Sequence, residues 1–244
     1  MKRRGDTLWL VALYAVAMAY LESAVVVYLR RIYGITDLTT SLTRFDPQIS
    51  AIEVGREAAT LVMLVAVGWL AGGRSRQSRI GHLFVAFGVW DIFYYVWLHV
   101  FIGWPASLLA PDLLFLIPAP WWGPVLAPSL IALLMVVGGV RAVQLADRGV
   151  RARASAATIS LLAVGCVLML VAFLWDALRI LPADAAQLAA VKPTPFLWPL
   201  YLAGLAAAVA SVWRMTFPGA LDRADAGGLA PVQPASGSLL PIDE

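Results

Sequence analysis

Six long runs of apolar residues dominate the chain, and short segments between them hold most of the charges. An α-helix rises about 1.5 Å per residue, so about 20 apolar residues cross the roughly 30 Å hydrocarbon core of a bilayer. The pattern predicts an all-α transmembrane bundle over residues 1–216, with about six spanning helices. We expect these helices at residues 7–29, 47–72, 81–101, 124–145, 156–180 and 196–215.

The two ends of the chain differ from these runs. Lys2, Arg3 and Arg4 precede the first run, as basic residues do in a signal peptide. The apolar part of a signal peptide is about 7–15 residues long, however, and this run is longer. We therefore expect a retained first helix. Residues 217–244 are rich in Gly, Ala, Pro and Ser without helical periodicity, which predicts a disordered cytoplasmic tail.

Composition supports a membrane environment, because 61% of the 244 residues are hydrophobic and only 14% are charged. Soluble domains carry roughly 45–50% apolar and about 25% charged residues. The net charge of +3 is small, and its placement in loops indicates a membrane rather than a nucleic acid as partner. The single cysteine, Cys166, excludes an intrachain disulfide, and we expect its thiol to be buried.

Basic residues predict how the chain is oriented. Lys and Arg gather at residues 2–4, 74–79 and 141–153, and fewer lie in the alternate loops. Cytoplasmic loops carry this excess, so we expect both ends in the cytoplasm of a bacterium, with the chain in its inner membrane. Arg30 and Arg31 are exceptions, because they follow the first helix on the predicted outer side.

The predicted outer loop at residues 102–123 is unusually apolar. It contains no Lys or Arg, and its one acid is Asp112. Several prolines disfavour a further spanning helix there, while Trp121 and Trp122 are typical of a membrane–water interface. We predict an interfacial or re-entrant segment, whose backbone must be covered by protein or line a cavity.

Polar side chains inside the predicted helices suggest a site. A charge within a spanning helix costs about 2.5–3.5 kcal/mol on insertion scales, so each one needs a reason. The helical rise places these acids at the midplane or in the outer half of the membrane. The candidate binding residues are Glu22, Glu53, Arg56, Glu57, Asp91, Tyr94, Tyr95, His99 and Asp176.

Spacing places Arg56 in a cluster of acids. Glu53, Arg56 and Glu57 are three and four residues apart and therefore share one helix face. A buried guanidinium cannot lose its proton. We therefore expect Arg56 to pair with Glu22, Glu57 or Asp91.

Two interpretations of this polar cluster remain open. In the first, Arg56 and its acids form a buried ion network that only fixes helix packing. In the second, the helices line a polar pocket that opens outward beneath the Trp-rich loop. Asp91, Tyr95 and His99 recur every four residues and would line one side of that pocket. Helices that point apart would exclude both interpretations.

Motifs for more specific chemistry are missing from the sequence. It contains no Glu-x-x-His pair, nucleophile elbow, phosphate loop or zinc motif, so we expect no metal site and no cofactor. Small residues at Gly204, Ala207, Ala208 and Ser211 form one face of the last helix. Such a face permits close helix approach, and we expect it to serve internal packing.

Four stretches resemble a family of bacterial multi-pass membrane proteins with no assigned function. They are YLESAVVVYLR at 20–30, REAATLVM at 56–63, FGVWDIFYY at 87–95 and DLLFLIP at 112–118. The resemblance covers the first four helices and their loops. It implies a polytopic membrane protein and lends no chemistry.

Three functions fit these observations. We expect a membrane binding module with an outward-facing acidic and aromatic pocket for a small or lipophilic ligand. The first alternative is a non-catalytic subunit of a larger membrane complex, whose partners would be other membrane-protein subunits. The second is an enzyme acting on a lipid or isoprenoid at the outer leaflet, with Glu57 or Asp91 as acid–base group and Arg56 holding an anionic head. The lipid bilayer is a partner in every case.

Overall fold

A computed structural model describes residues 4–34, 47–115, 119–152, 154–183, 187 and 193–217. Over these residues the chain is an all-α bundle, as predicted. The predicted tail lies outside the described residues except for Phe217. The six long helices are α1 (Arg4–Ile32), α3 (Pro47–Ala71), α4 (Arg76–Ile102), α5 (Leu126–Asp147), α6 (Ala156–Leu178) and α8 (Trp198–Thr216).

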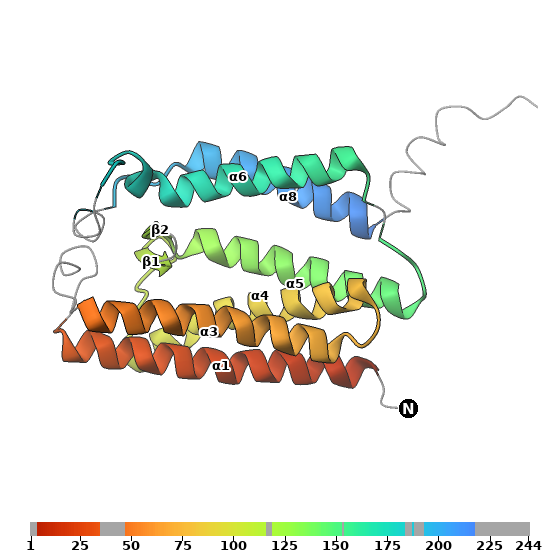
Figure 1. Ribbon diagram of the computed structural model, residues 1–244, viewed down its shortest axis with the longest axis horizontal. Helices are drawn as coiled ribbons and strands as arrows, with labels where there is room; N and C mark the ends of the chain where they lie inside the picture. Colours follow the sequence, from red (N-terminus) through yellow and green to blue (C-terminus); the bar gives the residue numbers. More distant parts are fainter. Residues whose placement is uncertain are drawn as a thin grey trace, which may run out of the picture.

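All six helices run along the long axis of the molecule and alternate in direction (Figure 1). The end of α1, the start of α3, the end of α6 and the start of α8 therefore meet at one end. A short β-hairpin lies there as well, and we call this the hairpin end. The α3–α4 turn and the α5–α6 connection lie at the opposite end (Figure 1).

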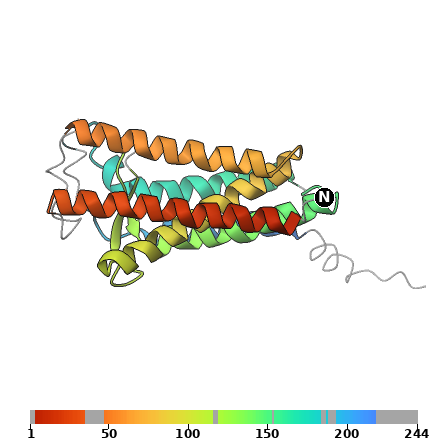
Figure 2. The same cartoon turned by 90° about the horizontal axis from the view of Figure 1, so that it is seen from below.

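The helices form two packing groups. In the first group, α4 packs against α1, α3 and α5, and Figure 2 shows it crossing α1 and α3 obliquely. In the second group, α6 and α8 pack along each other. The groups meet where α8 contacts α5 and where α6 contacts the hairpin.

Small residues let the helices cross closely in both groups. A Cβ atom added at Gly165 of α6 would lie 2.7 Å from the carbonyl oxygen of Gly204 on α8, and one at Gly88 of α4 would lie 2.4 Å from the carbonyl oxygen of Ala132 on α5. The small face of the last helix thus packs internally, as predicted. Cys166 was predicted to be buried, and this is wrong: it is exposed, because α8 covers only one face of α6.

Local capping decides where α4 begins and ends. It starts at Arg76 rather than at residue 81, because the Ser75 side chain accepts a hydrogen bond from the Ser78 backbone N–H. It ends at Ile102, because the next residue, Gly103, has a left-handed φ of 66° and its N–H bonds to the carbonyl of His99.

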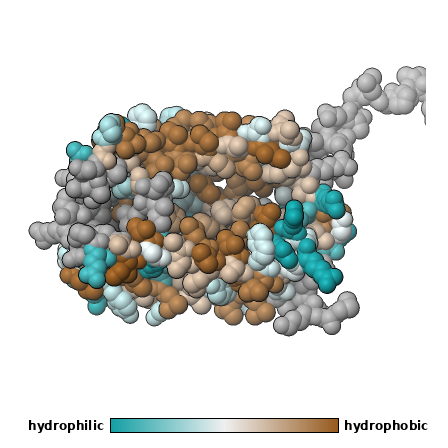
Figure 3. Space-filling model, viewed as in Figure 1, coloured by the Kyte–Doolittle hydropathy of each residue, from teal (hydrophilic) through white to brown (hydrophobic). Residues whose placement is uncertain are grey.

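Five of the six helices are long and apolar enough to cross a membrane: α1, α3, α4, α5 and α6. Figure 3 shows apolar residues over the middle of the molecule and hydrophilic residues gathered toward its ends. The chain is therefore a multi-pass membrane protein. α8 is not among the five, since Trp, Tyr, Pro and Arg residues lower its mean hydropathy, although it lies antiparallel alongside α6 (Figure 1).

The apolar loop predicted to lie outside contains the hairpin, which the sequence did not predict. Strand β1 (Pro111–Phe115) pairs antiparallel with β2 (Trp121–Pro124), and a bulge interrupts the pairing between Leu113 and Phe115. Pairing satisfies backbone groups that an apolar environment would leave without partners. Pro111 and Pro124 lie opposite each other at the open end of the ladder.

Candidate functional site

Arg56 is the centre of an ion cluster between α1 and α3, formed with Glu22, Glu53 and Glu57. Its Nη1 pairs with Glu22, one of the three predicted partners, and its Nε lies 2.8 Å from Oε2 of Glu53. Thr60 Oγ1 donates to the other Glu22 oxygen at 3.2 Å. Glu57 is buried, and its charge interacts with that of Arg56. The helices therefore converge around this cation.

A second group of polar residues connects α4 with the hairpin. The Tyr95 hydroxyl donates a hydrogen bond of 3.1 Å to Oδ2 of Asp112, which is only 2% exposed. Oδ2 of Asp91 is buried without a hydrogen-bond partner, and the charges of Asp91 and Asp112 interact. The rings of Tyr94 and Tyr95 meet edge to face at 5.1 Å. We call these four residues, together with Arg30, the carboxyl cluster.

The contacts of Arg30 account for a basic residue on the predicted outer side. Its guanidinium stacks 4.3 Å above the ring of Trp104, and its charge acts on Asp112. This cation–π contact and the nearby carboxylate stabilise a charge that the positive-inside rule disfavours there. In the sequence, Arg30 stands out only as an exception to the positive-inside pattern, and that exception was the one available signal of its role.

Asp112 lies in the hairpin, outside the spanning helices, and its burial changes its acidity. Burial raises the pKa of Asp112 to about 7. The charge of Arg30 and hydrogen bonds from Tyr95 and the backbone of Leu113 act in the opposite direction and limit the rise. A carboxyl with this pKa exchanges its proton near neutral pH.

Two predicted site residues lie apart from the clusters. His99 is exposed near the end of α4, where its Nδ1 lies 3.1 Å from the carbonyl oxygen of Pro105. The stripe of Asp91, Tyr95 and His99 therefore does not act as one surface. Asp176 lies on α6, in the other packing group, where its carboxylate accepts hydrogen bonds from Thr194.

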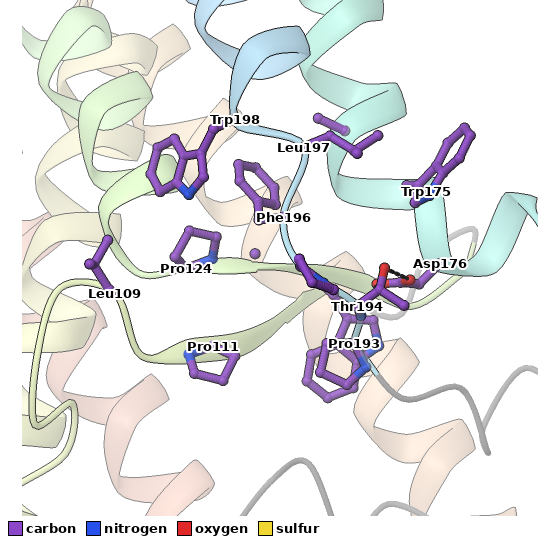
Figure 4. Close-up of a pocket in the computed structure, with 14 residues that line it drawn as sticks. Leu109, Pro111, Pro124, Trp175, Asp176, Pro193, Thr194, Phe196, Leu197 and Trp198 are labelled. Carbon is purple, nitrogen blue, oxygen red and sulfur yellow. Dashed lines mark hydrogen bonds between the residues drawn. The ribbon is translucent and has the colours of Figure 1, made fainter.

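A pocket of about 370 Å³ lies at the hairpin end, bounded by the hairpin, α6 and the start of α8. We call it the aromatic pocket. Trp198 and Trp175 lie on opposite sides of Phe196, and Asp176 lies next to Thr194 (Figure 4). Its walls are formed by Leu109, by residues 111 and 122–124, by Ala172, Trp175 and Asp176, and by residues 193–198.

The aromatic pocket differs from the predicted one in position. It shares only Asp176 and Trp122 with the predicted residues, and neither the ion cluster nor the carboxyl cluster lines it. The hairpin separates the two regions, since Asp112 of β1 bonds to α4 while β2 contacts α6. Nothing in the sequence indicates that Thr194 and Phe196 lie next to the hairpin, since they follow a proline-containing link without a periodic pattern.

The predicted interfacial tryptophans occupy different environments. Trp122 is 2% exposed and is therefore covered by protein. Trp121 is partly buried and stacks on Phe173 of α6 with ring centres 6.3 Å apart. The hairpin backbone is thus covered from the α6 side, one of the two arrangements that a re-entrant segment requires.

Comparisons of the chain with protein-family profiles, with curated proteins and with solved structures find no match. The likeness of residues 20–30, 56–63, 87–95 and 112–118 to a family of multi-pass membrane proteins therefore stays a resemblance. Among the described residues, no three His, Cys, Asp or Glu side chains come together in a way that would hold a metal ion.

Proposed function

We propose that this protein is a membrane binding module that holds a small lipophilic molecule in the aromatic pocket. The pocket itself carries the proposal: about 370 Å³ of space with walls that are mostly aromatic, proline or aliphatic. Sites for small molecules have volumes of about 300–1,000 Å³ and combine apolar walls with a few polar groups. Asp176 and Thr194 supply such polar groups at one side.

The proposed setting is the bacterial inner membrane, with the hairpin end facing outward and α8 as the sixth span. Exposed arginines at the opposite end, among them Arg74 and Arg151, support a cytoplasmic location for that end and for both termini. Tryptophans near the hairpin support a position close to the outer membrane–water interface. A lipophilic molecule could then enter the pocket from the outer leaflet.

The two polar clusters have a supporting role in this proposal. The bond from Tyr95 to Asp112 fixes β1 against α4, and β1 in turn positions β2, which forms one wall of the pocket. The ion cluster ties α3 to α1 in the same packing group. The polar residues thus hold the frame against which the ligand packs.

A substitution that fills the pocket tests the proposal. Ala172 is buried in the pocket wall, whereas Ala163 is exposed on the same helix. Ala172→Leu should remove most of a small molecule that co-purifies with the protein in mild detergent, because the added side chain takes its space. Ala163→Leu should leave the occupancy unchanged. Mass spectrometry of extracts from matched amounts of protein measures both.

Two results of this experiment would contradict the proposal. Unchanged occupancy in Ala172→Leu would place the bound molecule elsewhere. A wild-type protein that carries no small molecule but a stoichiometric second protein would favour the complex-subunit function.

Orientation can be tested with single cysteines in a Cys166→Ala background. Leu109 and Val150 are exposed at the hairpin end and at the opposite end. An impermeant thiol reagent on intact cells should label Leu109→Cys and spare Val150→Cys, which should react only after lysis. Labelling of position 150 in intact cells would reverse the proposed orientation.

A further inference from the structure

Among the described residues, the wall of the aromatic pocket has one charged residue, and that residue is an acid. Of the described residues that line the pocket, only Asp176 is ionisable, and none is Lys, Arg or His. Four aromatic side chains line the same space: Trp122, Trp175, Phe196 and Trp198. An anionic head group would therefore meet a carboxylate, with no cation among the described wall residues to offset it.

Asp176 is held in a fixed position at the pocket. Thr194 donates two hydrogen bonds to it, from the backbone N–H to Oδ2 at 3.0 Å and from the hydroxyl to Oδ1 at 2.5 Å. The carboxylate side chain is 8% exposed. Because both bonds come from uncharged donors, they orient the carboxylate without neutralising its charge.

In the described part of the chain, Arg179 is a cation that lies near Asp176, outside the pocket wall. Arg179 Nε is 3.5 Å from Oδ1 of Asp176, and its side chain is 43% exposed. An ion pair with so exposed a partner is weak, since solvent screens it. Arg179 therefore offsets little of the negative charge that Asp176 presents to the pocket.

A carboxylate beside several aromatic rings matches one class of ligand. Ring faces are electron-rich and attract an organic cation, and quaternary ammonium groups are recognised in this way. We propose that the molecule held in the aromatic pocket carries an ammonium group, which sits beside Asp176 among the rings. This inference rests on the proposed function and specifies its ligand class: a lipophilic amine or the ammonium head of a lipid.

The experiment compares two probes that differ only in charge. Hexyltrimethylammonium and its neutral isostere, with a tert-butyl group in place of trimethylammonium, are titrated into wild-type protein in maltoside detergent. Tryptophan fluorescence and the unfolding temperature report binding. The ammonium probe should bind about tenfold more tightly, a factor within the range of cation–π and ionic contributions. Free choline is a third probe: tight binding would indicate a soluble cation, and a need for the alkyl tail would indicate a lipid.

Variants locate the charge preference. Asp176→Asn should reduce the tenfold preference to nearly one, because the amide keeps the shape of the side chain and loses its charge. Asp147→Asn, an exposed acid at the opposite end of the molecule, should leave the preference unchanged. Thr194→Val removes one hydrogen bond, retains the charge of Asp176, and should keep most of the preference.

Failure of this inference can be separated from failure of the proposed function. Equal binding of the two probes to wild-type protein, weakened for both by Ala172→Leu, would overturn the ammonium ligand and retain the lipophilic site. A preference for ammonium that Asp176→Asn leaves intact would also overturn it. Binding of both probes that is insensitive to Ala172→Leu would remove the pocket itself as the site. The comparison of probes needs only wild-type protein, so it holds even if Asp176→Asn fails to fold.

Discussion

The two packing groups share close crossings at small residues and differ in how they bury charge. In the first group, α1, α3 and α4 bury charges and join them in the ion cluster and the carboxyl cluster. In the second group, the described part of α6 buries one charge, Asp176, and α6 and α8 cross at Gly165 and Gly204 with backbones nearly in contact. The first group has a similar close crossing, at Gly88 of α4 and Ala132 of α5.

This difference follows from what lipid does as a solvent. Lipid chains are as apolar as leucine, so the hydrophobic effect gives helices little reason to associate. Helices then rely on polar contacts or on close van der Waals packing between small residues. The first group uses both, whereas α6 and α8 rely mainly on close packing. The hairpin connects the two groups, since β1 bonds to α4 through Asp112 and β2 packs on α6. The aromatic pocket lies where they meet.

The largest expected effect is the dependence of the free energy of unfolding on pH. Burial raises the pKa of Asp112 from its ordinary 3.8 to about 7. The folded state then binds this proton more tightly than the unfolded state, so the stabilisation is complete below about pH 4 and is lost as the pH rises through about 7. The loss is roughly 4 kcal/mol at most, at about 1.4 kcal/mol per pKa unit. Thermal unfolding in detergent across this range measures it.

Asp112→Asn is the variant that tests the source of this pH dependence. The amide cannot ionise. The unfolding temperature of the Asp112→Asn protein should therefore vary much less between pH 4 and 7 than that of the wild type. Asp147→Asn, at an exposed acid, should keep the wild-type slope. A wild-type slope in Asp112→Asn would assign the pH dependence to other groups.

The next largest effect is expected at Arg56. Arg56→Met removes the partner of Glu22 and Glu53 and leaves their charges unpaired. Such a loss costs about 3–5 kcal/mol for fully buried pairs. The Arg56 side chain is 22% exposed, so we expect a smaller loss of about 2–3 kcal/mol in the free energy of unfolding. Unfolding in detergent with increasing denaturant measures it.

Two further variants sharpen the comparison at Arg56. Arg179→Met removes the more exposed cation of the second group and should cost less than about 1 kcal/mol. A second change, Glu22→Gln in the Arg56→Met background, should restore part of the lost stability, since one unpaired charge is removed. Additive losses in the double mutant would show that the two side chains do not depend on each other.

The smallest effect is expected from a single methyl group. Gly165→Ala places a Cβ 2.7 Å from the Gly204 carbonyl oxygen, so α6 and α8 must separate. Overpacking costs about 1–3 kcal/mol, of which the better helix propensity of alanine offsets up to about 1. Gly55→Ala on α3 meets no atom within 4 Å and should leave stability unchanged or raise it slightly. Equal unfolding temperatures for the two variants would contradict close packing at Gly165.

Much of the bundle could be predicted from the sequence. The run predicted at residues 47–72 became α3 at Pro47–Ala71, and the other helix bounds agree within a few residues except at the start of α4. The pairing of Arg56 with Glu22 was one of three predicted possibilities. These features depend on neighbours along the chain: on run length, helical spacing and the high free energy of an isolated charge in lipid.

Only the tertiary structure decided where the polar residues and the pocket lie. Apolar length shows that a helix can span a membrane, but it does not show which helix face meets which neighbour. That choice depends on side-chain shape, such as the Gly165–Gly204 crossing, which leaves α6 beside α8. The bonds from Tyr95 to Asp112 and from Thr194 to Asp176 join segments 17 and 18 residues apart, across links that carry no periodic pattern. The sequence alone thus determined a membrane bundle with buried charges, and three-dimensional packing placed its pocket on the other side of the hairpin, because packing brings together residues that no spacing rule relates.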